Sequence, residues 1–198
     1  MVLYSQPELY HFCQDSILAP RVIARDLEGC AIARALDVCA GCGVMGLELQ
    51  AALRLPVAAF DFLDVQVEFE SHFRSNLEIT GLRGNWILAN YSVLSTPEYS
   101  ERYDLIIANP PYFLKDESSL SPSELNNRAR FFLDADLRTL LRGVRNALTP
   151  KGRAYILMKS GKEHGRDAFT SARIELFDCR VERLADIRGT DLVKITRD

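Results

Sequence analysis

The chain lacks any long apolar run. Of its 198 residues, 47% are apolar, yet no stretch approaches the roughly 18 consecutive apolar residues that span a membrane. The amino terminus also lacks the basic segment followed by an apolar one that is typical of a signal peptide. We therefore predict a cytoplasmic protein that makes no membrane contact.

Cysteine and histidine are too few and too scattered for two common kinds of site. The five cysteines are odd in number and unevenly spaced, so we do not expect a disulfide framework. Cys39 and Cys42 have C-x-x-C spacing, but no second pair of ligands accompanies them, so we expect no metal site. A redox pair at a helix start remains an alternative for these two thiols.

Repeats, low-complexity segments and linkers are also missing. A chain of 198 residues without such boundaries is most simply one domain. We therefore treat residues 1–198 as a single domain, with 1–34 as a segment that leads into it.

Basic residues are scarce in the first half of the chain. Residues 1–100 contain 6 Lys or Arg and 12 Asp or Glu, whereas residues 101–198 contain 18 and 15. The basic excess in the carboxyl half predicts either a binding surface for RNA or DNA or a solvated helix face. The asymmetry alone does not separate the two. Oligomeric state is left open.

Strands and helices alternate through most of the chain. Short apolar runs predict strands at 35–39, 57–63, 86–89, 103–108 and 154–158, with further strands at 174–177 and 192–196. Helical patterns predict helices at 14–24, 44–54, 66–80 and 134–148, the last capped by Asp134, and weaker helical character at 162–171. The alternation favours an α/β fold, a doubly wound and mostly parallel sheet with helices on both faces.

Asn109-Pro110-Pro111-Tyr112 follows the apolar strand at 103–108. Neither proline has an N–H for the sheet ladder, so the chain must leave the sheet at Asn109. An amide, a proline carbonyl and an aromatic ring therefore stand at the carboxyl end of a strand, where open α/β sheets bind ligands.

A glycine turn joins the first strand to the next helix. Gly41 and Gly43 permit positive φ and close approach of backbone to a ligand, and the helix amino terminus points N–H groups at it. The G-x-G-x-x-G spacing also fits an NAD-dependent oxidoreductase. Asp37, however, ends the strand before the turn, and a carboxylate there would repel a pyrophosphate but suits a cationic ammonium.

With these motifs the chain resembles the class I S-adenosylmethionine-dependent methyltransferases. The stretch 36–49 is similar to their first motif, except that Cys39 stands where the family has its first glycine. The resemblance implies a Rossmann-like sheet with an antiparallel strand near the carboxyl terminus, and S-adenosylmethionine as cofactor. It places Asp37, Cys39, Gly41, Gly43 and Asn109 against the cofactor.

Two further cofactor contacts follow from the same resemblance. Asp64 is the acid expected to hold the ribose hydroxyls, with Asp61 as the alternative because it also lies near the strand end. Asn90 stands where the family usually has an Asp that accepts from the adenine amino group, a role that an amide oxygen can also fill.

More narrowly, 10–19, the glycine turn and the Asn-Pro-Pro-Tyr stretch together resemble the bacterial tRNA adenine-N6 methyltransferases. The resemblance implies that Asn109 and the Pro110 carbonyl accept from the amino group to be methylated, that Pro111 shapes the turn, and that Tyr112 stacks on the base. We expect RNA as the substrate. Protein glutamine, whose enzymes usually carry an extra amino-terminal domain, and DNA adenine remain alternatives.

Overall fold

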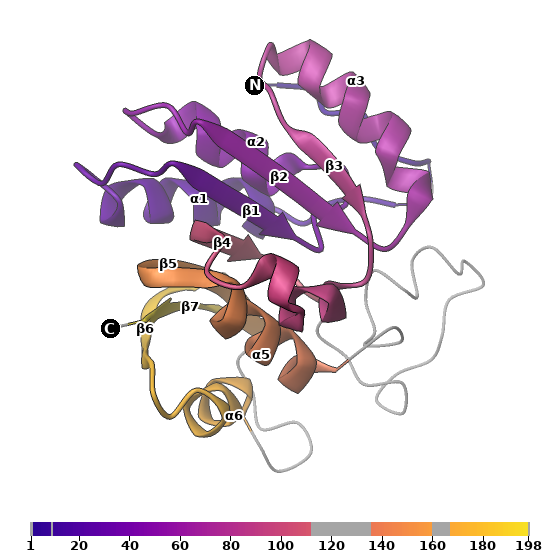
Figure 1. The fold of residues 1–198 in the computed structure, drawn as a ribbon. Coiled ribbons are helices and arrows are strands. Elements are labelled where there is room, and N and C mark those ends of the chain that lie inside the picture. Colours follow the sequence, from indigo (N-terminus) through magenta and orange to yellow (C-terminus); the bar gives the residue numbers. More distant parts are fainter. Residues whose placement is uncertain (1, 9, 112–135, 160–166, 198) are drawn as a thin grey trace.

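The computed structural model describes residues 2–8, 10–111, 136–159 and 167–197. Within these ranges seven strands form one sheet in the order β3-β2-β1-β4-β5-β7-β6 (Figure 1). The strands are β1 (Arg34–Val38), β2 (Ala59–Asp64), β3 (Asn85–Leu88), β4 (Tyr103–Ala108), β5 (Leu148–Lys159), β6 (Arg180–Ile187) and β7 (Thr190–Thr196). Strands β1 to β5 pair in parallel, and β7 is antiparallel to both β5 and β6. The predicted doubly wound, mostly parallel α/β sheet is confirmed.

Helices cover both faces of this sheet. The α-helices are α1 (Asp15–Asp26), α2 (Val44–Ala52), α3 (Glu70–Thr80), α5 (Leu137–Ala147) and α6 (Ala168–Glu175), and the 3-10 helices are η1 (Val67–Phe69), η2 (Tyr91–Ser95) and η3 (Pro97–Tyr99). Neighbouring strand residues point to opposite faces. Ala35 packs under α1, α2 and α3, whereas Leu36 packs under η2, α5 and α6. The core is therefore two apolar layers separated by the sheet.

The carboxyl ends of β1, β2, β3 and β4 meet at one edge of the sheet. Backbone bonds continue the ladder there, from Ala40 N to Leu63 O at 3.1 Å and from Ala89 N to Asp64 O at 3.0 Å. Each of these strands is followed by one of the predicted site segments. The parallel pairing thus brings together segments that are far apart in sequence.

One of the two strands predicted near the carboxyl terminus was wrong. The segment 174–177 was predicted as a strand, but Ile174 lies in α6 and Phe177 follows that helix with 87% of its surface exposed. The strand before the last is β6, which forms the edge of the sheet and carries four charged residues among its eight.

The start of α5 also differs from the prediction. Asp136 is the helix cap, and its Oδ1 accepts from the Thr139 N–H at 2.8 Å. The predicted cap, Asp134, lies outside the described residues, as do residues 162–166 of the helical segment predicted at 162–171, and the rest of that segment overlaps α6. Among the residues that the structure describes, no helix has the length and apolar character to cross a membrane.

Candidate functional site

The turn between β1 and α2 is held in a backbone conformation that favours glycine. Gly41 has φ 53° and Gly43 has φ 79°, and the Gly43 N–H donates to the Ala40 carbonyl at 2.8 Å. Cys39 also has a positive φ, 58°. This strain, of order 1–2 kcal/mol for a residue with a side chain, falls at the position where the resembled family has glycine.

Gly43 is required at this turn for a second reason, which gives a prediction for Gly43→Ala. An added Cβ would stand 2.6 Å from Phe73 Cδ2, so the substitution combines φ strain with overpacking. We expect unfolding by urea to show a loss of about 2–5 kcal/mol in the free energy of unfolding. Gly29→Ala is the matched control, because Gly29 has φ 78° but nothing within 4 Å, and it should lose only about 1–2 kcal/mol. Equal losses would contradict the packing argument.

Asp37 lies behind the turn, with 1% of its surface exposed. Its Oδ2 accepts from the Gly46 N–H at 2.9 Å and so fixes the first turn of α2 against the end of β1. Burial, with a smaller contribution from the nearby Asp64 charge, raises the pKa of Asp37 from 3.8 to about 8, although the Gly46 bond opposes the rise.

The raised pKa of Asp37 predicts that stability falls with increasing pH. Between pH about 4 and about 8 the folded chain binds a proton at Asp37 that the unfolded chain has lost, so the free energy of unfolding declines across this window. Asp37→Asn removes the ionisation. Its stability relative to the natural protein should therefore rise by up to about 1.4 kcal/mol per pH unit. Urea unfolding of both proteins at pH 5.5, 6.5 and 7.5 measures this, and a difference independent of pH would contradict it.

The structure separates Asp64 from Asp61. Asp64 ends β2 beside the glycine turn, where its Oδ2 accepts from the Gly41 N–H at 2.8 Å and its Oδ1 from the Gln66 N–H at 2.9 Å. Two backbone bonds fix this carboxylate next to the turn.

The Asp61 side chain lies instead toward the amino-terminal ends of the strands. It accepts from the Tyr103 hydroxyl at 2.8 Å and the Asn85 amide at 2.9 Å. These two partners begin β4 and β3, so they mark the amino ends of the strands. Asp61 therefore serves the packing of the sheet, and Asp64 is the acid at the candidate site.

Asn76 on α3 is a residue whose importance the sequence did not reveal. It is fully buried, and its amide donates to the Cys42 carbonyl of the glycine turn and to the Ser5 carbonyl, each at 3.0 Å. Its Oδ1 accepts from the Ser5 N–H at 2.6 Å. A single side chain thus ties α3, the glycine turn and the amino-terminal segment together.

Asn109 stands at the end of β4 and is held by the start of α1. Its Nδ2 donates to the Ser16 hydroxyl at 3.1 Å and lies 3.4 Å from the Cys13 sulfur. Since Nδ2 faces Ser16, Oδ1 at the other end of the planar amide points elsewhere. Pro110 is buried and Pro111 is half-buried, whereas Tyr112 lies outside the described residues.

Several predicted residues line one small cavity of about 30 Å³. Asp37, Cys39 and Asn109 contribute to its wall, together with Tyr10 and Phe12 from the amino-terminal segment. This volume is about the space of one water molecule. Tyr10 and Phe12 therefore lie between the glycine turn and Asn109 as part of this wall.

Asn90 lies at the neighbouring strand end, after β3, but does not line this cavity. Its side-chain oxygen accepts from the Ser92 N–H at 2.8 Å and caps η2. The next residue, Tyr91, is buried in the core, and its hydroxyl donates to the Asp136 carbonyl at 3.3 Å. Tyr91 thus serves packing, and the Asn90 amide remains at the edge of the site.

The cysteines give no support to a redox pair. All five are free. Cys42 has 2% of its surface exposed, and burial raises the pKa of its thiol to about 12. A reactive pair needs a stabilised thiolate, which is the opposite of this environment.

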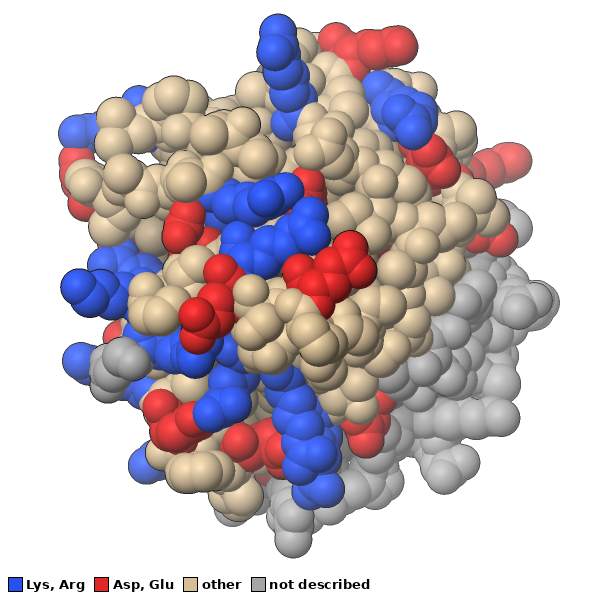
Figure 2. All heavy atoms as spheres, viewed as in Figure 1, with Lys and Arg blue, Asp and Glu red and all other residues tan. Residues whose placement is uncertain are grey.

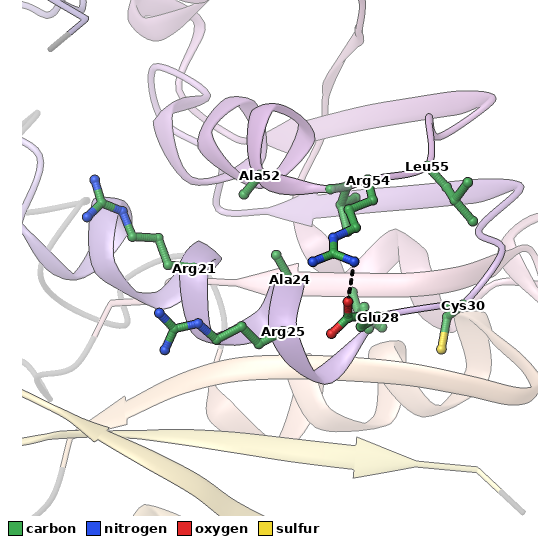
Figure 3. A pocket seen from close by; sticks show the side chains of 11 residues that line it. Arg21, Ala24, Arg25, Glu28, Cys30, Ala52, Arg54 and Leu55 are labelled. Carbon is green, nitrogen blue, oxygen red and sulfur yellow. Dashed lines mark ion pairs between the residues drawn. The ribbon is translucent and has the colours of Figure 1, made fainter.

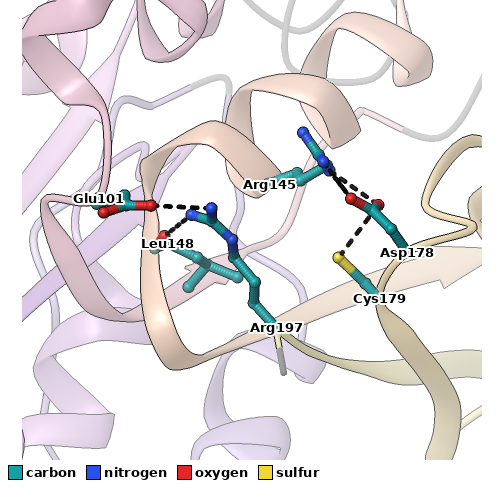
Figure 4. A network of polar contacts seen from close by, with 6 residues as sticks. All are labelled: Glu101, Arg145, Leu148, Asp178, Cys179 and Arg197. Atoms are coloured by element: carbon teal, nitrogen blue, oxygen red, sulfur yellow. Dashed lines mark hydrogen bonds and ion pairs between the residues drawn. The ribbon is translucent and has the colours of Figure 1, made fainter.

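The arginines of α5 are neutralised by acids near α6. Arg138 pairs with Glu175 at 3.1 Å, Arg142 pairs with the same carboxylate, and Arg145 pairs with Asp178. Figure 4 shows the Arg145 pair and the neighbouring Arg197–Glu101 pair. On the face seen in Figure 2, basic and acidic side chains lie next to one another. For α5, the solvated helix face is therefore the better interpretation of its basic residues.

Comparison with known sequences finds both nucleic-acid and protein methyltransferases. A tRNA1(Val) (adenine(37)-N6)-methyltransferase from Dyadobacter fermentans is 32% identical over 124 residues, covering 63% of this chain and 50% of the relative. A ribosomal protein uL3 glutamine methyltransferase from Neisseria meningitidis is 28% identical over 187 residues, covering 86% of this chain and 59% of the relative. The chain thus spans little more than half the length of these relatives.

The fold and a family profile agree with these relatives. The Thermus thermophilus 16S rRNA methyltransferase RsmC, solved in complex with AdoMet and guanosine, superposes with a TM-score of 0.68 at 16% identity, covering 96% of this chain and 45% of that one. The sequence profile of the methyltransferase small domain family matches residues 11–166. The chain therefore belongs to the methyltransferase small domain family.

Proposed function

We propose that this chain is an S-adenosylmethionine-dependent methyltransferase that acts on an exocyclic amino group, and that residues 1–198 form one methyltransferase domain. The observation that carries the proposal is the position of Asn109, one strand away from the glycine turn and beside the same cavity. Family membership and the resemblance of the Asn-Pro-Pro-Tyr stretch support it.

The residues at the strand ends fit S-adenosylmethionine chemically. Gly41 and Gly43 bring backbone close to a ligand, and the Asp64 carboxylate, held beside Gly41, is placed to accept from the ribose hydroxyls. Asp37 and Cys39 lie on the side of the methionyl group, and Asn90 on the side of the adenine. The cofactor is much larger than the cavity, which on this proposal takes only its methionyl end.

Asn109 and Pro110 orient the acceptor. The lone pair of an exocyclic amino nitrogen is delocalised into the ring, so the group needs orientation more than it needs a base. Asn109 Oδ1 and the Pro110 carbonyl accept hydrogen bonds from the two N–H groups of the amino nitrogen. These bonds turn its lone pair toward the methyl group that the bound cofactor supplies. In the amide orientation observed, Nδ2 donates to the Ser16 hydroxyl, and Oδ1 is the end that accepts from the substrate. Correct positioning alone can remove as much as about 7–11 kcal/mol of barrier.

We propose N6 of adenine in RNA, most specifically tRNA, as the acceptor. The amino-terminal segment, the glycine turn and the Asn-Pro-Pro-Tyr stretch support this choice, as does the adenine-N6 relative. Tyr112 then stacks on the base, which contributes about 1–3 kcal/mol, and the base must be unpaired or flipped out. A glutamine amide of a protein is the second candidate, because the glutamine methyltransferase relative covers 86% of the chain.

The test is transfer of label from radioactive S-adenosylmethionine in a cell extract supplied with the purified protein. We expect label in the RNA fraction, sensitive to ribonuclease and resistant to protease. Label that protease removes would show the glutamine alternative instead. Asn109→Ala protein serves as the control for label that other enzymes transfer.

A further inference from the structure

A row of arginines runs along the outer side of α1. Arg21 and Arg25 are one helical turn apart, and Gln14 lies two turns before Arg21 on the same stripe. Arg188, from the connection between β6 and β7, hydrogen-bonds to the Gln14 amide and so extends the row to the start of the helix. We call Arg188, Arg21 and Arg25 the α1 arginine row.

The charge of this row is not compensated within the described part of the chain. The guanidinium groups of Arg21 and Arg25 are exposed and form no ion pair or hydrogen bond with a described residue. The acids at the end of the helix are used elsewhere, since Glu28 pairs with Arg54 at 2.5 Å and Asp26 with Lys194 at 2.7 Å. Like charges one turn apart repel each other, so an anion that contacts both would relieve this repulsion.

A cleft lies beside the row. It has a volume of about 300 Å³ and separates the end of α1 from the end of α2, with Arg21, Arg25 and Arg54 on its walls. Figure 3 shows the Arg54–Glu28 pair across the cleft, while the Arg21 and Arg25 side chains extend toward the amino-terminal end of α1. The cleft thus holds one neutral ion pair and adjoins the two uncompensated arginines.

The helix that carries the row contacts the candidate catalytic residue with its other, buried side. Ser16, in the first turn of α1, accepts from the Asn109 amide at 3.1 Å. With a rise of 1.5 Å per residue, Arg21 and Arg25 lie about 8 and 14 Å farther along the helix axis. The helix that holds Asn109 therefore also bears two uncompensated positive charges, farther along its axis.

We propose that the α1 arginine row binds the phosphodiester backbone of the RNA whose adenine enters the site at Asn109. The proposal rests on the proposed function and assigns the RNA contact to the amino-terminal helix. Arginine suits this role because its planar group donates two parallel hydrogen bonds to phosphate. The α5 arginines do not fill the role, because Glu175 and Asp178 already pair with them.

The test compares two double variants for binding to fluorescently labelled bulk tRNA. Arg21→Ala/Arg25→Ala removes two uncompensated charges of the row. Arg138→Ala/Arg142→Ala is the matched control, since it removes two arginines with the same spacing that share Glu175. We expect an affinity loss of at least tenfold for the first and less than twofold for the second. The slope of log affinity against log salt should fall by about 1.5 for the first alone.

Three outcomes would overturn the proposal. They are unchanged affinity of the α1 variant, equal losses in both variants, and absence of tRNA binding by the natural protein. Unchanged affinity together with label transfer into RNA would reject the role of the α1 arginine row in RNA binding but keep the proposed function. Label transfer into protein alone would reject the RNA substrate itself. Equal affinity of all three proteins for S-adenosylhomocysteine verifies that the variants are folded.

Discussion

Asn109→Ala should lower kcat for methyl transfer by at least about 100-fold, comparable to removing one transition-state hydrogen bond in other enzymes. The reason is that Oδ1 accepts from the amino group only when the amide is present and oriented. Asn109 also lines the small cavity beside the glycine turn. We therefore expect a loss of S-adenosylhomocysteine affinity too, but one below tenfold and so smaller than the loss in kcat. Single-turnover label transfer and calorimetry measure the two quantities.

Substitutions of Ser16 should lower kcat less than Asn109→Ala does. Ser16→Ala removes the acceptor that holds the Asn109 Nδ2, so we expect a kcat loss of about tenfold with cofactor affinity unchanged. Ser16→Thr retains a hydroxyl and should recover most of the rate. Full activity of Asn109→Ala, or equal losses in the Ala and Thr variants of Ser16, would contradict the assigned orientation.

Asp64→Ala should weaken S-adenosylhomocysteine binding by at least about 30-fold. Two hydrogen bonds from ribose hydroxyls to a carboxylate are lost, each worth about 1.5–3 kcal/mol in a charged pair, and a partial replacement by water offsets some of this. The loss of acceptors for Gly41 N and Gln66 N also loosens the turn. Calorimetric titration with S-adenosylhomocysteine measures the affinity.

Asp61→Ala is the matched control, because it removes the same side chain three residues earlier on the same strand. It leaves the Tyr103 hydroxyl and the Asn85 amide without their acceptor, so we expect a loss of about 2–4 kcal/mol in the free energy of unfolding. S-adenosylhomocysteine affinity below the unfolding transition should change less than threefold. The reverse pattern, with Asp61→Ala abolishing binding and Asp64→Ala sparing it, would exchange the two assignments.

The sequence was sufficient for the centre of the sheet. The run Tyr103–Ala108 is entirely apolar except for Asp104, which is typical of a parallel strand buried on both faces, and the prolines mark its end. The glycines at 41 and 43 likewise predicted a turn with positive φ. These features could be recognised because local residues determine them.

The errors occurred where distant contacts decide the structure. The edge strand β6 carries charges that obscure its alternation, whereas Ile174 resembles a strand residue but lies in the last turn of α6 with 64% of its surface exposed. Sequence spacing alone could not show which sheet edge Asp61 faces. It also did not reveal the role of Asn76, because the three backbone groups that its side chain binds come from residues 5 and 42.

The most direct test of the central claim is identification of the labelled product. RNA labelled by the protein with radioactive S-adenosylmethionine is digested to nucleosides and separated by chromatography. We expect the label to co-elute with N6-methyladenosine and to be absent with Asn109→Ala. Label in a ring-nitrogen, carbon or ribose methyl product, or in N5-methylglutamine from the protein fraction, would contradict it.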